Sequence, residues 1–194
     1  MKIFSRLYEK IMCYSKHPKA PWYLFALSFA ESSFFIIPPD VMLAPMCLAK
    51  PKKAMWLAFI TTLASILGGI LGYLIGFFAF SLIEDWLMTT SYWESFQTAM
   101  NWFEKYGFWA VFLSGFFTPI PYKVFTIAAG AMKMTFMPFL IASILSRGSR
   151  FLVVAGVMAL GGEKMEHLMK KYIDIAGWIT VLLIVVGVLV YEFI

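Results

Sequence analysis

The chain has 194 residues, of which 61% are hydrophobic and 14% are charged, with a net charge of +5 and a mean hydropathy of +0.80. Soluble domains are about 45–50% apolar and about 25% charged, so these values exclude both an ordinary soluble domain and a disordered chain. In so apolar a chain, the positive charge favours membrane phosphate over nucleic acid as a partner. Two cysteines and two widely separated histidines predict no disulfide framework, metal site or cofactor.

The first 49 residues predict a surface helix followed by a membrane hairpin. Residues 1–19 are basic and carry apolar residues near helical spacing, which predicts an amphipathic helix on the membrane surface. In residues 21–49, Pro38 and Pro39 interrupt an apolar stretch that also contains Glu31 and Asp40. Each half is too short for the roughly 20 apolar residues that a spanning helix needs. We predict a re-entrant hairpin that turns at the prolines, with one broken span as the alternative.

Residues 54–83 follow without a single charge and predict a long transmembrane helix. Small residues in this segment form a ridge for close helix packing, namely Gly68, Gly69, Gly72 and Gly76. Residues 84–105 are acidic and aromatic, which is typical of an amphipathic segment at the membrane interface, here the periplasmic one.

The second part of the chain repeats this order. Residues 106–132 are apolar, broken by Pro119 and Pro121, and carry Lys123 directly after the break, which predicts a second re-entrant hairpin. Residues 134–162 are long enough to span, although Arg147 and Arg150 lie near their middle. Residues 175–191 form a short final span.

The charges support an inverted repeat. If both proline-containing segments are hairpins, 11 of the 16 Lys and Arg lie on the side of the N-terminus, which the positive-inside rule makes cytoplasmic. Phe34-Phe35 before Pro39 matches Phe116-Phe117 before Pro121, and residues 63–67 match residues 141–145. We therefore predict an all-α integral membrane protein with two inverted repeats, each a re-entrant hairpin followed by a long transmembrane helix.

Five ionisable residues are predicted at membrane depth: Glu31, Asp40, Lys123, Arg147 and Arg150. Such charges are costly and usually face a cavity, a partner or a substrate path. Because the hairpin tips of an inverted repeat meet, we expect the acids to approach Lys123 or the arginines. Structural ion pairs that hold the hairpins are one interpretation, and snorkelling is another for Lys123.

The functional interpretation assigns these residues to substrate binding and proton coupling. Arg147 and Arg150 are three residues apart on one helical face, and two guanidinium groups suit a phosphate or pyrophosphate. Protonation of Glu31 or Asp40 would weaken their salt bridges to the arginines and couple proton entry to release of an anionic headgroup. No nucleophile with a base at membrane depth is visible, so we expect no enzyme.

The sequence resembles the DedA family of bacterial inner-membrane proteins, also called the SNARE-associated or VTT-domain family, and most closely its YqaA-like branch. The residues that carry the resemblance are 29–40, the glycine-rich 68–76, 118–130 and 147–151. The resemblance implies opposed re-entrant hairpins and movement of lipids, with undecaprenyl phosphate as a polyprenyl substrate. It also implies that Glu31 and Asp40 match family acids, and that Pro119 and Gly130 match family positions of the second hairpin.

The sequence departs from the family pattern at three positions. The family acid of the first long helix falls on Gly69, and two family arginines fall on Phe116 and Tyr122. Our leading hypothesis is a transporter or flippase for a lipid or lipid phosphate in the bacterial inner membrane. A non-transporting assembly scaffold and a proton-linked small-solute exchanger are the alternatives. The expected partners are membrane lipids, and a homo-oligomer is compatible with the sequence.

Overall fold

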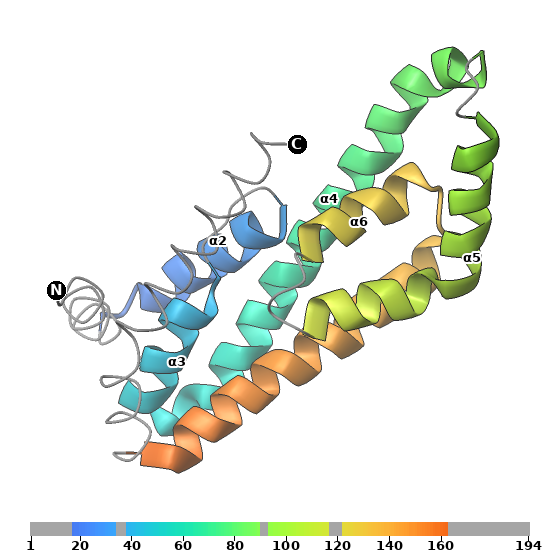
Figure 1. Cartoon of the computed structure of the whole chain (residues 1–194). Coiled ribbons are helices and arrows are strands. Elements are labelled where there is room, and N and C mark those ends of the chain that lie inside the picture. The colour runs from blue at the N-terminus through green and yellow to red at the C-terminus, as the bar shows by residue number, and fades with distance from the viewer. Residues whose placement is uncertain (1–16, 34–37, 90–92, 117–121, 163–194) are drawn as a thin grey trace, which may run out of the picture.

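The structure, a computed structural model, describes residues 17–33, 38–89, 93–116 and 122–162. These residues form α2 (Ala20–Ser33), α3 (Asp40–Ala49), the 3-10 turn η1 (Pro51–Lys53), α4 (Ala54–Met88), α5 (Trp93–Phe116), α6 (Tyr122–Ala131) and a last helix, Phe136–Gly162 (Figure 1). No strand occurs in these ranges, so the prediction of a helical chain is confirmed. Two helical stretches, Pro51–Phe80 and Phe136–Gly162, are long and apolar enough to cross a membrane.

The helix bounds differ from the predicted segment bounds in the middle of the chain. Helix α4 continues to Met88, beyond residue 83, and α5 runs through the boundary predicted at residues 105 and 106. Hydropathy reports where a chain leaves an apolar phase, whereas a helix ends where its backbone hydrogen bonds end. The predicted segment 175–191, most of segment 1–19, Pro119 and Pro121 lie outside the described residues.

Helices α2 and α4 run parallel and are joined by hydroxyl groups. Ser28 Oγ donates a 2.8 Å hydrogen bond to the carbonyl of Thr61, and one turn later Ser32 and Ser65 share a 2.7 Å hydroxyl contact. Ser33 Oγ donates to the carbonyl of Gly68 at 3.2 Å. Small side chains allow this close approach, which places the C-terminal end of α2 beside the middle of α4.

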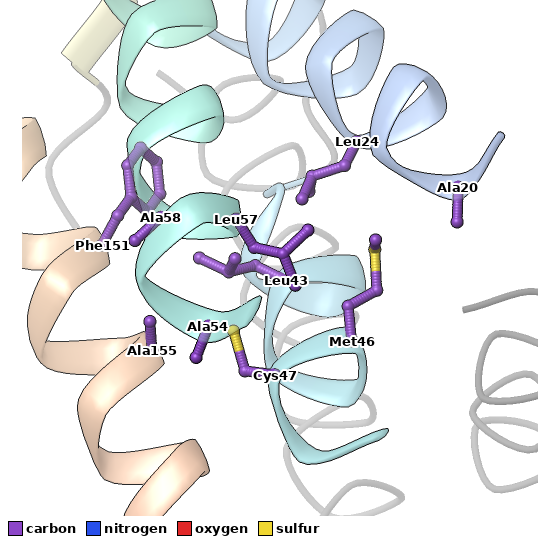
Figure 2. Packing of buried hydrophobic residues seen from close by; sticks show 10 residues of the cluster. All are labelled: Ala20, Leu24, Leu43, Met46, Cys47, Ala54, Leu57, Ala58, Phe151 and Ala155. Atoms are coloured by element: carbon purple, nitrogen blue, oxygen red, sulfur yellow. The ribbon is translucent and has the colours of Figure 1, made fainter. Parts of the chain in front are cut away.

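Helix α3 returns toward the start of α4. Pro38 and Pro39 precede it, and the carbonyl of Pro39 accepts the first-turn amide hydrogen bonds of Met42 and Leu43. Figure 2 shows the apolar cluster that results, in which side chains from the beginning of α2, the end of α3 and the beginning of α4 meet Phe151 and Ala155 of the last helix. The α2–α3 pair therefore begins and ends near the same end of α4 and reaches its middle in between.

Helix α6 packs on the second half of α4, and α5 returns beside it. A Cβ atom at Gly130 or at Gly76 would overlap backbone atoms of the facing helix, so the two backbones touch there. The hydroxyl of Tyr73 on α4 donates to the carbonyl of Met134, just after α6, at 2.5 Å. Near the start of α6, Tyr122 lies against Gly69. This second pair of helices therefore reaches the middle of α4 from the opposite end.

The last helix runs antiparallel to α4 (Figure 1). Phe139 lies beside Tyr73, with ring centroids 4.9 Å apart, and Arg147 contacts Ser65. Phe151 belongs to the apolar cluster at the beginning of α4. Arg147 thus lies close to the middle of α4, where the α2–α3 pair arrives from one end of α4 and the α5–α6 pair arrives from the other.

Candidate functional site

Four charged side chains from three helices meet beside the middle of α4. Glu31 is in the last turn of α2, and Asp40 is the first residue of α3. Arg147 and Arg150 are one turn apart on the last helix. The structure pairs Arg147 with Glu31 and Arg150 with Asp40. Both predicted acids therefore lie against the predicted arginines.

Arg147 is fully buried and is held from several directions. Its Nη2 lies 2.5 Å from Oε2 of Glu31 and 3.3 Å from Oγ of Ser32, and its Nε donates to Oγ of Ser65 at 2.6 Å. Ser32 also donates to Glu31 Oε2 at 3.0 Å, so the hydroxyls join acid and base into one network. A buried charge requires such compensation, because desolvation costs several kcal/mol per ion, on the order of what a well-formed pair returns.

Aromatic rings add to the environment of Arg147. Its guanidinium carbon lies 4.9 Å from the ring centroid of Tyr122 and 4.8 Å from that of Phe151. Ring faces attract cations, and the attraction grows where water is excluded. These rings come from α6 and from the helix of Arg147 itself, so Arg147 connects both helix pairs.

Arg150 has a simpler environment. Its Nη2 contacts Oδ2 of Asp40, and its guanidinium carbon lies 5.8 Å from the ring centroid of Phe151. The side chain of Asp40 is 25% exposed, compared with 18% for Glu31. This pair is therefore the more accessible of the two.

The hydroxyl of Tyr122 is buried without a hydrogen-bond partner, and so is one atom on each of two charged side chains of the site, Nη1 of Arg147 and Oδ1 of Asp40. Buried polar groups are nearly always paired, so each such atom calls for an explanation, such as a ligand. Of the two atoms on charged side chains, one is a donor and the other an acceptor. The arrangement can therefore receive an additional anionic oxygen at the arginine.

The remaining predicted residues within the described ranges lie just before α3 or on α4 and α6. Lys123 is in the first turn of α6, where its carbonyl accepts a 2.9 Å hydrogen bond from Thr126. Gly68 faces α2, whereas Gly72 and Gly76 face α6, so the predicted glycine ridge serves both helix pairs. At Gly69 a Cβ would collide with the hydroxyl of Tyr122. A residue larger than glycine at position 69 is thus incompatible with this placement of the tyrosine.

Sequence reasoning missed the residues that surround Arg147. Hydroxyl residues recur four apart in two apolar helices, at 28 and 32 and at 61 and 65, and this pattern was a usable signal for a polar seam. Phe151 is four residues after Arg147, which places it on the same helical face. The ring of Tyr122 had no local signal, since it reaches the site through tertiary packing.

No cluster of His, Cys, Asp and Glu suited to a metal ion occurs among the residues that the structure describes. The site is instead a set of ion pairs with hydroxyl and aromatic support. Comparison with known proteins identifies the kind of chain that carries it. Residues 37–160 match the VTT domain. This chain belongs to the VTT-domain (DedA) family. With its two long apolar helices, it is a membrane protein.

Relatives of this VTT-domain protein occur in several organisms. An uncharacterized protein of Haemophilus influenzae is 49% identical over 187 residues, covering 96% of this chain and 97% of its own. An uncharacterized protein of Histophilus somni is 44% identical, covering 99% and 100%. Undecaprenyl phosphate transporter A of Staphylococcus aureus is 27% identical over 134 residues, covering 63% of this chain and 64% of its own. No solved structure gives a significant match.

Proposed function

We propose that this VTT-domain protein moves a lipid or lipid phosphate between the leaflets of the bacterial inner membrane. The observation that carries the proposal is the position of Arg147. This residue lies near the middle of the last apolar helix and beside the middle of α4, where it is fully buried with Nη1 unpartnered. A guanidinium at this depth is costly, so it is found where other groups compensate its charge completely or where it has a function. Here the compensation lacks one hydrogen bond, which a phosphate oxygen would supply.

The chemistry of the pair favours phosphate as the bound group. Arg147 and Arg150 present two guanidinium groups one helical turn apart, and guanidinium donors match phosphate oxygens in bidentate geometry. The name of the Staphylococcus aureus relative supports an isoprenoid phosphate as the substrate class, with undecaprenyl phosphate as the leading candidate. Position 69 has glycine where the family has an acid, and we expect this difference to affect which substrate the protein prefers.

The helix pairs support a re-entrant arrangement in the membrane. Helices α2 and α3 begin and end at one end of α4, and α5 and α6 approach from the other, so each pair penetrates to mid-depth. Half-buried Lys50 and exposed Lys52 and Lys53 lie just before α4, on the side that the positive-inside rule assigns to the cytoplasm. The chain would then be multi-pass with a cytoplasmic N-terminus.

Proton coupling follows from the same contacts. Each arginine is paired with a carboxylate, and a proton on that carboxylate would remove its attraction to the guanidinium. Proton entry at Glu31 or Asp40 would thus free an arginine to bind the headgroup, and proton loss would restore the salt bridge and release the headgroup. This is the reverse of the coupling expected from the sequence, in which proton entry accompanies release.

Reconstitution in liposomes tests the function. A fluorescent undecaprenyl phosphate analogue in one leaflet should reach the other faster with the wild-type protein than in protein-free vesicles, and Arg150→Ala should abolish the difference. Lys105→Ala removes an exposed base from α5 and serves as the matched control. Equal rates in wild-type and protein-free vesicles, with correctly inserted protein, would refute transport and favour the scaffold alternative.

A further inference from the structure

The two ion pairs of the site differ in how firmly they are held. Arg147 is fixed by one carboxylate, two serine hydroxyls and two aromatic rings, and none of its surface is exposed. Arg150 has one carboxylate and one more distant ring, and 9% of its surface is exposed. Opening the first pair would break several buried contacts at once, whereas opening the second breaks one contact beside accessible surface.

The helices that carry the acids differ in the same direction. Helix α2 is tied to α4 by the hydroxyls of Ser28 and Ser33, which flank Glu31 along the helix. Asp40 begins α3, whose N-cap, Pro39, offers no side-chain hydrogen bond to the first turn. Oδ1 of Asp40 is also unpartnered, so half of this carboxylate lacks fixation. Asp40 can therefore leave its arginine with less disruption than Glu31.

We propose that an anionic phosphate group exchanges with Asp40 on Arg150, while the Arg147–Glu31 pair stays closed as an anchor. This inference rests on the proposed function and assigns different roles to two pairs that the sequence treats alike. Asp40 and the phosphate compete for the same guanidinium, because each offers two oxygens to its donors. Glu31 is a positioning residue: it orients Arg147 and through it the helix that carries Arg150.

Competition between Asp40 and the phosphate for Arg150 predicts an effect of mutation that a purely structural Asp40–Arg150 pair would not show. Removing the competing charge with Asp40→Asn should tighten phosphate binding about tenfold, the equivalent of one charge-assisted hydrogen bond. Glu31→Gln should leave that affinity unchanged or weaken it, and it should lower the thermal unfolding midpoint more than Asp40→Asn does. Arg150→Gln should weaken binding about tenfold or more, with Arg150→Lys between it and wild type.

The experiment uses the purified full-length protein in a neutral detergent. Dioleoyl phosphatidic acid is titrated, with dioleoyl phosphatidylcholine as the lipid without an exposed phosphate monoester, and binding is followed by native mass spectrometry. Lys105→Gln is the matched control, because it removes one exposed positive charge on α5. Inorganic phosphate is added as a competitor to distinguish the two sources of the anion. If inorganic phosphate at the same concentration does not displace phosphatidic acid, the bound anion is a lipid headgroup. If it does displace the lipid, the exchange on Arg150 is supported but a lipid substrate is contradicted.

The outcomes separate this proposal from the function on which it rests. Equal tightening by Asp40→Asn and Glu31→Gln, or unchanged binding in Arg150→Gln, overturns the division of roles while transport in liposomes still stands. Absence of binding of both phosphatidic acid and inorganic phosphate overturns both. Should Arg150→Gln fail to fold, Arg150→Lys and Asp40→Asn test the same proposal, since the first should weaken phosphate binding and the second should tighten it.

Discussion

Tyr122 and Gly69 share one space where α6 crosses α4. A Cβ atom at position 69 would lie 2.7 Å from the hydroxyl oxygen of Tyr122 and 3.2 Å from the nearest ring carbon. The centroid of the same ring lies 4.9 Å from the guanidinium carbon of Arg147. The glycine thus lets the tyrosine lie next to the arginine, and the residue types at 69 and 122 depend on each other.

Gly69→Ala should therefore destabilise the protein by about 1–3 kcal/mol, the usual cost of overpacking a well-packed position. Tyr122→Phe removes the closest atom, so the same Gly69→Ala change should cost less in that background. Thermal unfolding of the wild type, the two single variants and the double variant in detergent measures the coupling as a double-mutant cycle. Gly156→Ala is the control, since a Cβ there meets nothing within 4 Å, and it should be neutral or slightly stabilising. Additive effects of Gly69→Ala and Tyr122→Phe would contradict the shared space.

Gly130→Ala should behave differently, because the colliding atoms belong to the backbone. A Cβ at Gly130 would overlap the carbonyl oxygen of Tyr73, and no single side-chain truncation can relieve this. We expect a loss of about 3 kcal/mol or more and a displaced α6, measured as a lower unfolding midpoint and poor membrane accumulation. Rescue by truncating a neighbouring side chain, such as Tyr73→Phe, would show that the helices are not in backbone contact.

Ser65→Ala tests the hydroxyl support of Arg147. Ser65 Oγ accepts the 2.6 Å hydrogen bond from Nε, and the mutation leaves a buried charged donor unpaired. The expected loss is about 1.5–3 kcal/mol of stability. Ser149→Ala is the control, since Ser149 bonds only within its own helix, to the carbonyls of Leu145 and Ser146. Equal midpoints for the two variants would remove Ser65 from the site.

The sequence predicted the helical class, and it singled out Glu31, Asp40, Arg147 and Arg150 together with Lys123, because charge in an apolar stretch stands out against its surroundings. The structure joins the first four in two ion pairs. The sequence did not decide which acid meets which arginine, since Glu31 and Asp40 lie 116 and 110 residues from their partners. It also missed Tyr122 as a neighbour of Arg147, since that contact depends on how α6 lies on α4. The predicted segment bounds at residues 83 and 105 do not coincide with helix ends, since α4 ends at Met88 and α5 runs from Trp93 to Phe116, because composition marks the apolar phase and not the hydrogen-bonded helix.

The orientation of the two helix pairs gives a final prediction, which labelling of single cysteines can test. Lys19 precedes α2, Lys52 precedes α4, and both are exposed, whereas Lys105 lies on α5 toward the opposite end of α4. If α2 and α3 form a re-entrant hairpin, cysteines at 19 and 52 should react from the cytoplasmic side only, and a cysteine at 105 from the periplasmic side only.

The background for this labelling is Cys13→Ser with Cys47→Ala, since alanine suits the buried position of Cys47. Membrane-impermeant maleimide applied to intact spheroplasts and to inverted vesicles distinguishes the two sides. Reaction of positions 19 and 52 from opposite sides would mean that residues 21–49 cross the membrane fully. Asp40 would then no longer lie at the tip of a hairpin, and its proposed exchange with a phosphate group on Arg150 would need another route for the headgroup.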